Sequence, residues 1–263
     1  MIRVHNLRKQ FEKTQVINDI SFTVNPGEII AFLGKNGAGK TTTMRMISGF
    51  MKPTSGEVHV CDNPVEKDST SIKTDIGYLP EGNPLVKEMD VYEYILFHAG
   101  LKKVENPIKK TKEIIKKTQL ADKAGEKIEH LSKGYRQRVG LAAAMIADPP
   151  VLLLDEPLSG LDPSQKVEMR KLIKEISKDK AILISTHILP EVVELCDKAL
   201  LIHKGSIVFN GTIEELRKKH AHTKIRVEFD VPARTAEDKI KKLSNITDIA
   251  IEGNELIVNP VEK

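Results

Sequence analysis

The sequence predicts an α/β protein whose mostly parallel β-sheet is covered by helices on both faces. Short apolar runs alternate with segments whose apolar residues recur at helical spacing, the pattern of strands and helices in such folds. A glycine-rich loop joins one apolar run directly to a helix-like segment, and a later apolar run ends in two carboxylates. Both features belong at the carboxyl ends of parallel strands, where open α/β sheets bind ligands.

The N-terminal third is expected to consist mainly of strands, with one helix directly after the glycine-rich loop. The Pro26–Gly27 pair, and Pro53 with Gly56, mark breaks between these segments. The expected strands are 2–5, 16–24, 28–33, 57–61 and 76–79, and the expected helix is 41–50.

Between residues 90 and 148 the pattern changes to helices, which predicts an inserted helical subdomain at about 86–148. The α/β alternation then resumes, and a capping box formed by Thr212 and Glu215 predicts one more helix through Lys219. The strands expected in this part are 151–154, 181–185, 199–202 and 207–210, and the helices are 167–176, 191–196 and 212–219.

The C-terminal stretch 223–263 is expected to form a small α+β extension, separate from a main domain at 1–220. Its pattern predicts a strand at 225–231, a helix at 236–243 and a hairpin at 249–258. A passive appendage and an element that stabilises or regulates a dimer both remain open for this extension.

Composition and charge bound the class of protein. The 263 residues are 40% hydrophobic and 30% charged, as in a soluble globular protein. The apolar runs fall far short of the roughly 20 residues of a membrane-spanning helix, and no secretory signal is expected at the start. The two cysteines, Cys61 and Cys196, fit no metal-ligand spacing and are expected to be reduced thiols.

Positive charge is concentrated in the segment 101–120, which holds seven lysines against two glutamates in a chain of net charge +4. Such a run is most often the solvated face of a helix, and this interpretation is favoured. The alternative is closeness to an anionic membrane surface, where each lysine adds roughly 1 kcal/mol of attraction. Nucleic-acid binding is not expected, because no aromatic residues are interleaved with these lysines.

The glycine-rich loop GKNGAGKT matches the phosphate-binding pattern G-x-x-x-x-G-K-[ST] of P-loop NTPases. Glycines let backbone N–H groups approach phosphate oxygens, and the following helix adds its positive end. Lys40 is expected to reach the β- and γ-phosphates, Thr41 to bind Mg²⁺ and Thr42 to support a phosphate. The loop alone leaves kinase, GTPase and ATPase open. Its expected nucleotide-binding residues are Gly34, Lys35, Asn36, Gly37, Ala38, Gly39, Lys40, Thr41 and Thr42.

Two further strand ends carry candidate catalytic groups. Asp155 suits the coordination shell of Mg²⁺, and Glu156 suits a general base that deprotonates an attacking water, which a kinase would not need. His187 follows another buried strand and is expected to donate to the γ-phosphate. The octapeptide LSKGYRQR at 131–138 places Ser132 and Gly134 at a helix start, a second anion-binding geometry. The chain already has one complete phosphate loop. A second phosphate-binding helix start is therefore expected to bind the nucleotide of another subunit.

From residue 2 to 219 the chain resembles the ATP-binding subunits of ABC transporters. A finer resemblance, to ATPases of the gliding-motility and drug or antibiotic export branch, rests on IGYLPEGNPL at 76–85 and LSKGYRQRVGLAAA at 131–144. The motifs that carry the family resemblance are GKNGAGKT at 34–41, LSKGYRQR at 131–138, VLLLDEP at 151–157, SGLDP at 159–163 and STH at 185–187.

The resemblance implies a P-loop NTPase fold with an N-terminal antiparallel β subdomain. It also implies that two such chains, identical or different, pack head to tail and enclose ATP and Mg²⁺. Each site would join the phosphate loop, Asp155, Glu156 and His187 of one chain to Ser132 and Gly134 of the other, with Asp162 coupling the sites. Phe11 would lie against the adenine beside Val16, and a place for Phe11 in the core is the alternative.

By the same resemblance, the subunit lies on the cytoplasmic face of the cell membrane and drives a separate permease, an exporter of unknown substrate. Lys133 and Tyr135 depart from the usual LSGGQ signature. Glu81 stands where the family usually has a glutamine, and it is expected to contact Mg²⁺ and the attacking water. A soluble ABC-type ATPase of translation or DNA repair would carry a second such domain or a long coiled coil. A non-hydrolysing regulator would not need Glu156 and His187.

Overall fold

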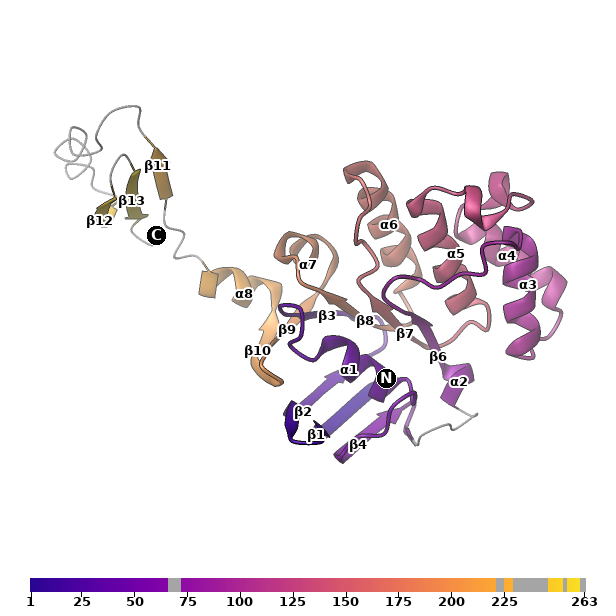
Figure 1. Ribbon diagram of the computed structural model, residues 1–263, viewed down its shortest axis with the longest axis horizontal. Helices are drawn as coiled ribbons and strands as arrows, with labels where there is room; N and C mark the ends of the chain where they lie inside the picture. Colours follow the sequence, from indigo (N-terminus) through magenta and orange to yellow (C-terminus); the bar gives the residue numbers. More distant parts are fainter. Residues whose placement is uncertain (66–71, 221–224, 229–245, 253–254, 261–263) are drawn as a thin grey trace. The chain divides into compact units, whose positions relative to one another are not determined.

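The computed structural model describes residues 1–65, 72–220, 225–228, 246–252 and 255–260. The chain divides into two compact units, Met1–Gly211 and Thr212–Lys263. Figure 1 shows the first unit as two sheets with helices packed around them. Within the described parts of the chain, no helix is long and apolar enough to cross a membrane.

The central sheet of the first unit is mostly parallel, as predicted. β3 pairs with β8 and β9, and β7 pairs with β6 and β8, in every case parallel. Strands β3, β7 and β8 are buried along their whole length, which explains why they read as continuous apolar runs. In spatial order the strands are β10 (Ser206–Thr212), β9 (Lys198–His203), β3 (Ile29–Leu33), β8 (Ala181–Thr186), β7 (Val151–Asp155) and β6 (Ile76–Leu79).

A second, antiparallel sheet is formed mainly by the N-terminal strands, as the family resemblance implied. The first strand is longer than the predicted 2–5 because its pairing shifts register after Val4, where Asn6 has a φ of 47°. This bulge ends the regular alternation of buried and exposed residues, so the pattern was lost although the strand continues. The strands are β1 (Ile2–Phe11), β2 (Thr14–Val24), β4 (Ser55–Val60) and β5 (Asn63–Pro64), in the order β2-β1-β4-β5.

Helices and the loops between them make up the rest of the first unit, and the stretch from 90 to 148 is mainly helical, as predicted. The helix expected at 167–176 begins one turn earlier, because Asp162 caps it and Pro163 occupies its first position. The helices are α1 (Lys40–Ile47), α2 (Ile72–Asp75), α3 (Val91–Leu101), α4 (Pro107–Lys117), α5 (Lys133–Met145), α6 (Pro163–Ile176) and α7 (Leu189–Leu195), with short 3₁₀ turns at Ala121–Lys123 and Ile128–His130.

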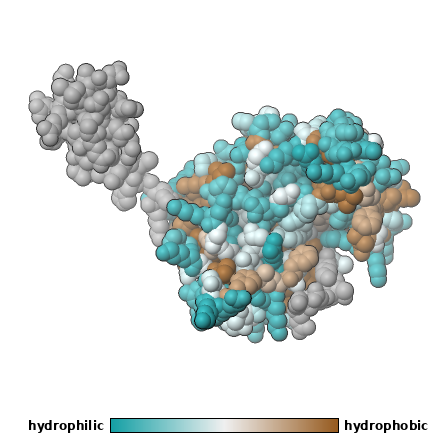
Figure 2. All heavy atoms as spheres, in the orientation of Figure 1, coloured by the Kyte–Doolittle hydropathy of each residue, from teal (hydrophilic) through white to brown (hydrophobic). Residues whose placement is uncertain are grey.

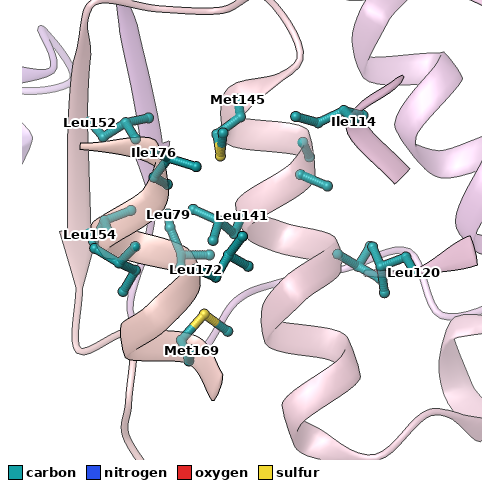
Figure 3. Close-up of a cluster of buried hydrophobic side chains, with 14 of the residues drawn as sticks. Leu79, Ile114, Leu120, Leu141, Met145, Leu152, Leu154, Met169, Leu172 and Ile176 are labelled. Carbon is teal, nitrogen blue, oxygen red and sulfur yellow. The ribbon is translucent and has the colours of Figure 1, made fainter. Parts of the chain in front are cut away.

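The two faces of the central sheet are covered by different layers. On one face, Leu152 and Leu154 of β7 pack in a core with residues of α3, α5 and α6 (Figure 3). On the other face, Leu153 and Phe32 pack in a core with α1 and the antiparallel sheet. Alternate residues of one buried strand therefore serve two cores, which fixes the register of the sheet and the position of its carboxyl edge.

The second unit contains the predicted capping box. The Thr212 N–H donates to Glu215 Oε2 over 2.8 Å, and the Glu215 N–H donates to Thr212 Oγ1 over 3.2 Å. The strands of this unit pair antiparallel in the order β11-β13-β12, and the expected helix at 236–243 lies outside the described residues. The elements are α8 (Ile213–His220), β11 (Ile225–Glu228), β12 (Ile246–Glu252) and β13 (Glu255–Pro260).

Truncating Leu141 should destabilise the first unit strongly. Leu141 on α5 is 0% exposed and lies in the core shown in Figure 3. We expect Leu141→Ala to lower the free energy of unfolding by about 2–5 kcal/mol in urea titrations, because the removed methyl groups leave a cavity. Val167→Ala, at a position that is 42% exposed on α6, serves as the control and should cost less than about 1 kcal/mol. Similar losses for both variants would contradict this account of the core.

Candidate active site

A cavity of about 350 Å³ lies at the carboxyl ends of β3 and β7. Four segments meet there: the start of β2, the glycine-rich loop, the loop after β6 and the acidic end of β7. The lining residues are Val16, Asn36, Gly37, Gly39, Lys40, Thr41, Thr42, Glu81, Asp155 and Glu156. All ten were singled out from the sequence, and the cavity brings them together.

The glycine-rich loop holds a backbone shape that requires its glycines. Gly39, the residue before α1, has a φ of 112°, and a Cβ there would overlap the Ile17 side chain. At Gly34 a Cβ would lie 2.6 Å from the carbonyl oxygen of Ile202. The loop therefore sits tightly on β2 and β9 while its other side faces the cavity.

Contacts behind the loop were not found from the sequence. The Gly205 N–H, in the turn between β9 and β10, donates to the Ala38 carbonyl over 3.1 Å, and the Asn18 N–H donates to the Gly205 carbonyl over 2.8 Å. The sequence marks Lys204–Gly205 as a turn, but nothing in it pairs that turn with a loop so far away in the chain. This bracing links the loop to both sheets.

Lys40 brings a positive charge into the cavity. Its side chain is buried, and its ammonium donates to the carbonyl of Gly34 over 2.7 Å and to that of Lys35 over 3.3 Å. The Nζ atom also lies 4.0 Å from Oε1 of Glu156. The lysine and the acidic strand end thus face each other across a few ångströms, where a phosphate group would fit between charges and backbone N–H groups.

The two carboxylates after β7 are both buried. Ser185 Oγ donates to Asp155 Oδ1, and the Glu156 N–H donates to Ser185 Oγ over 3.1 Å. Glu156 has a φ of 51°, a left-handed conformation that costs energy in a non-glycine residue and occurs preferentially at functional sites. His187, after β8, does not line the cavity, but its Nδ1 lies 2.8 Å from Glu156 Oε1, so the imidazole helps to fix this carboxylate; its donation to the γ-phosphate stays a prediction.

The oxygen atoms fit a magnesium ion. Asp155 Oδ2 and Glu156 Oε2 are buried, and neither has a hydrogen-bond partner within the part of the chain that the structure describes. Thr41 adds a hydroxyl to the same cavity. Mg²⁺ takes oxygen ligands and is usually held by one or two carboxylates together with phosphates, so this small donor set suffices.

Glu81 reaches the cavity from a tight turn after β6. The Asn83 N–H donates to the Pro80 carbonyl over 3.1 Å, and Gly82 has the positive φ, 79°, that a type II turn requires. The amide of Asn83 donates to the Arg136 carbonyl of α5 over 2.7 Å. A Cβ at Gly140 would overlap that amide, so the turn is fastened to α5 at a glycine. Sequence reasoning missed both Asn83 and Gly140.

Ser132 and Gly134 do not line the cavity of their own chain. Ser132 caps α5, and its Oγ accepts from the Tyr135 N–H over 3.4 Å. A Cβ at Gly134 would lie 2.8 Å from Cδ of Gln165 on α6, and the Lys133 side chain crosses over Gly160. The start of α5 is therefore packed on the 159–163 turn and the start of α6.

Asp162 caps α6 at this same place. Its carboxylate accepts from Ser164 Oγ over 2.7 Å and from the Gln165 N–H over 2.9 Å. These hydrogen bonds hold the pKa of the Asp162 carboxyl below its ordinary value, so it is charged at neutral pH. Two helix starts and one fixed carboxylate thus lie together, apart from the cavity.

Phe11 is 43% exposed at the end of β1, so the alternative that places it in the core is wrong. Lys9 Nζ lies 4.9 Å from the centre of its ring. Phe11 does not line the cavity, whereas Val16 does. Phe11 is therefore a partly exposed aromatic side chain at this end of the β1–β2 hairpin.

Comparison with known proteins gives one family. The ABC transporter family model matches residues 17–159, more than half of the chain. Nod factor export ATP-binding protein I of Burkholderia lata is 31% identical over 255 residues, which cover 95% of this chain and 84% of that protein. Bacitracin transport ATP-binding protein BcrA of Bacillus licheniformis is 34% identical over 225 residues, 84% of this chain and 72% of that protein.

A solved structure, that of the ATP-binding subunit of an ABC transporter, superposes with a TM-score of 0.75 at 28% identity. It covers 84% of this chain and 93% of its own length. The family model, the relatives and the solved structure all point to an ATP-binding protein of ABC transporters, as do the motifs that line the cavity. The chain belongs to the ABC transporter family, as an ATP-binding subunit.

Proposed function

We propose that this chain hydrolyses ATP, works as a head-to-tail dimer and powers a separate membrane permease, with its ATP-binding domain at 1–220. One observation carries the proposal: a single cavity joins Lys40 and Thr41 to the buried carboxylates of Asp155 and Glu156. Each carboxylate has one oxygen that accepts no hydrogen bond from the residues that the structure describes. ATP offers the matching groups, a triphosphate with its magnesium ion. The similarity to subunits named for Nod factor export and bacitracin transport favours an exporter, with this chain on the cytoplasmic face of the membrane.

The residues divide the chemistry among them. The loop N–H groups and Lys40 bind and orient the phosphates. Glu156 accepts the proton of the attacking water, and His187 positions the carboxylate of Glu156. Magnesium, when bound, supplies charge that neutralises the phosphates, and Thr41, Asp155 and Glu81 are the residues that would hold it. The buried position of Glu156 keeps its carboxylate close to the lysine and away from bulk water.

A second chain would complete each site. Ser132 and Gly134 start a helix whose positive end is suited to phosphate oxygens, yet they lie apart from the cavity of their own chain. Asp162 lies beside them and would join the two sites across the dimer. A solved ATP-binding cassette with the same fold is a dimer bound to ADP and phosphate, which supports this arrangement. The second chain can be a copy of this one or a related subunit.

The permease would dock in a mainly apolar groove of about 980 Å³ beside the nucleotide cavity. Phe50 and Leu101, both 63% exposed, lie on this groove. Pro80 and Asn83 also line it, whereas Glu81 of the same turn lines the nucleotide cavity. Because one short turn borders both spaces, pressure from a permease segment in the groove would move Glu81 relative to the nucleotide.

Loosening this turn should slow hydrolysis without weakening ATP binding. Asn83→Ala removes the hydrogen bond to the Arg136 carbonyl, so Glu81 is held less firmly. We expect kcat to fall about tenfold while KM stays within a factor of about three, because a misplaced group costs rate rather than ground-state binding. Asn63→Ala, at an exposed asparagine of β5, is the matched control. Equal kcat for the two variants would show that the fastening of the turn is immaterial.

The function as a whole is tested with purified chain. We expect release of ADP and phosphate from ATP that stops on chelation of magnesium, and a rise in the rate when a membrane permease that co-purifies with the chain is reconstituted with it. Absence of hydrolysis in the presence of both magnesium and that partner would overturn the proposal.

A further inference from the structure

The outer side of helix α4 is a basic surface that takes no part in the proposed nucleotide site. Thr111, Ile114 and Ile115 are buried, and the lysines of the helix point away from them, which confirms the favoured interpretation of the lysine run as an exposed helix face. Between residues 101 and 113 there are five lysines and two glutamates. This concentration of positive charge is expected to attract an anionic partner.

Much of this positive charge is unpaired. Lys110 lies 3.3 Å from Glu113 and Lys109 lies 4.0 Å from it, so one carboxylate is shared by two lysines. Lys112 and Lys116 are exposed and have no ion pair within the described residues. They follow Ile108 at intervals of four residues, so the three side chains form one stripe along the helix.

Apolar side chains are exposed beside these lysines. Ile108 is 58% exposed near the start of α4, and Phe97 and Leu101 of α3 are 51% and 63% exposed. Figure 2 shows hydrophobic residues at the surface over α3 and α4, bordered by hydrophilic ones. Exposed apolar side chains next to unpaired lysines are typical of surfaces that rest on the interface of a bilayer. We name this surface, Phe97, Leu101, Ile108, Lys109, Lys112 and Lys116, the hairpin patch.

We propose that the hairpin patch binds the headgroup layer of an anionic phospholipid bilayer. Lysines close to such a layer are attracted by its negative surface potential, and the apolar side chains can enter the interface. Phe97 is the one aromatic residue among the six of the patch and α4 contains none, so successive bases have no series of rings to stack on, which disfavours a nucleic acid as the occupant. Leu101 and Lys103 line the groove assigned to the permease, so the patch would face the same membrane as the permease. This orientation of the chain on the membrane rests on the proposed function.

Binding of the purified full chain to vesicles tests the proposal without a permease. We expect sedimentation with vesicles of phosphatidylcholine and phosphatidylserine, no binding above background to phosphatidylcholine alone, and loss of binding as salt is raised. Lys109→Glu/Lys112→Glu/Lys116→Glu should lower the partition coefficient at least about 100-fold, since each lysine near the surface contributes roughly fivefold. Ile108→Ser should weaken it about tenfold through lost apolar burial.

The matched control is Lys171→Glu/Lys174→Glu/Lys178→Glu, which changes the net charge equally at exposed positions in and just after α6. If this control still binds the vesicles, binding depends on the hairpin patch. If both triple variants lose binding equally, binding depends only on net charge, and the proposal is overturned. Equal binding to neutral vesicles, or tighter binding to duplex DNA with the same loss in the α4 variant, would also overturn it. ATP hydrolysis measured in parallel reports on the proposed function independently, since neither triple variant touches the nucleotide cavity.

Discussion

Replacing Glu156 with glutamine should abolish ATP turnover while leaving ATP bound. Glutamine has the same shape and can keep the contact with His187 Nδ1, now 2.8 Å from Glu156 Oε1, but its amide cannot take a proton from water. We expect phosphate release to fall at least about 100-fold to 1,000-fold, within the range attributed to general base catalysis. Because the phosphate loop and the proposed magnesium ligands Thr41, Asp155 and Glu81 are unchanged, ATP should accumulate in a closed dimer that light scattering detects.

The control for this variant is Glu175→Gln, which makes the same chemical change at an exposed residue of α6 and should leave turnover unchanged. If Glu156→Gln loses turnover but forms no dimer, Glu156 would still be the general base, but ATP binding alone would not close the dimer. Full hydrolysis by Glu156→Gln would instead remove Glu156 from the reaction, and the other buried carboxylate, Asp155, would then need examination as the proton acceptor.

The cavity itself could be predicted because its residues come in contiguous motifs. Lys40 and Thr41 follow directly from the phosphate-loop pattern, and Asp155 and Glu156 from their position after a buried strand. The parallel pairing of β3, β8 and β7 then brings these strand ends to one edge. Local pattern and the rule for ligand positions in α/β sheets suffice for this part of the site.

Contacts between distant segments could not be predicted in the same way. Gly205 braces the phosphate loop and Asn83 fastens its turn to α5, and each pairing depends on the final packing of two elements rather than on either sequence. Lys133, which departs from the family signature, crosses the bare backbone of Gly160. Tyr135, the other departure, lies near two cations, those of Lys123 and Arg138, which are 5.7 and 5.8 Å from its ring centre. Both substitutions have partners only once the chain is folded.

Aspartate in place of Gly134 should block the dimer while the monomer still binds ATP, although Gly134 is buried and the new side chain must displace that of Gln165. A carboxylate in the first turn of a helix is favourable for the isolated chain, because it faces the positive end of the helix. In the proposed dimer the same carboxylate would face the phosphates of the partner's ATP, and like charges at an interface cost several kcal/mol. We therefore expect turnover to fall at least about 100-fold while ATP affinity of the monomer stays within a factor of about three.

The control at this position is Gly134→Ala. An added Cβ would lie 2.8 Å from Cδ of Gln165, the mobile end of a flexible side chain, so alanine should be accommodated with little loss of turnover. Equal inactivation by alanine and aspartate would assign the effect to space at the α5–α6 contact rather than to charge facing a phosphate.

Mixing two inactive variants decides whether each site is shared between chains. A Gly134→Asp chain keeps its own phosphate loop, and a Lys40→Met chain keeps its own α5 start, so a mixed dimer has one site in which both parts are intact. Hydrolysis in the mixture should therefore exceed the sum of the two separate rates. If the start of α5 served the nucleotide of its own chain, no mixed dimer would contain an intact site and the mixture would stay inactive. The two results differ in kind, because only a shared site allows one chain to supply what the other lacks.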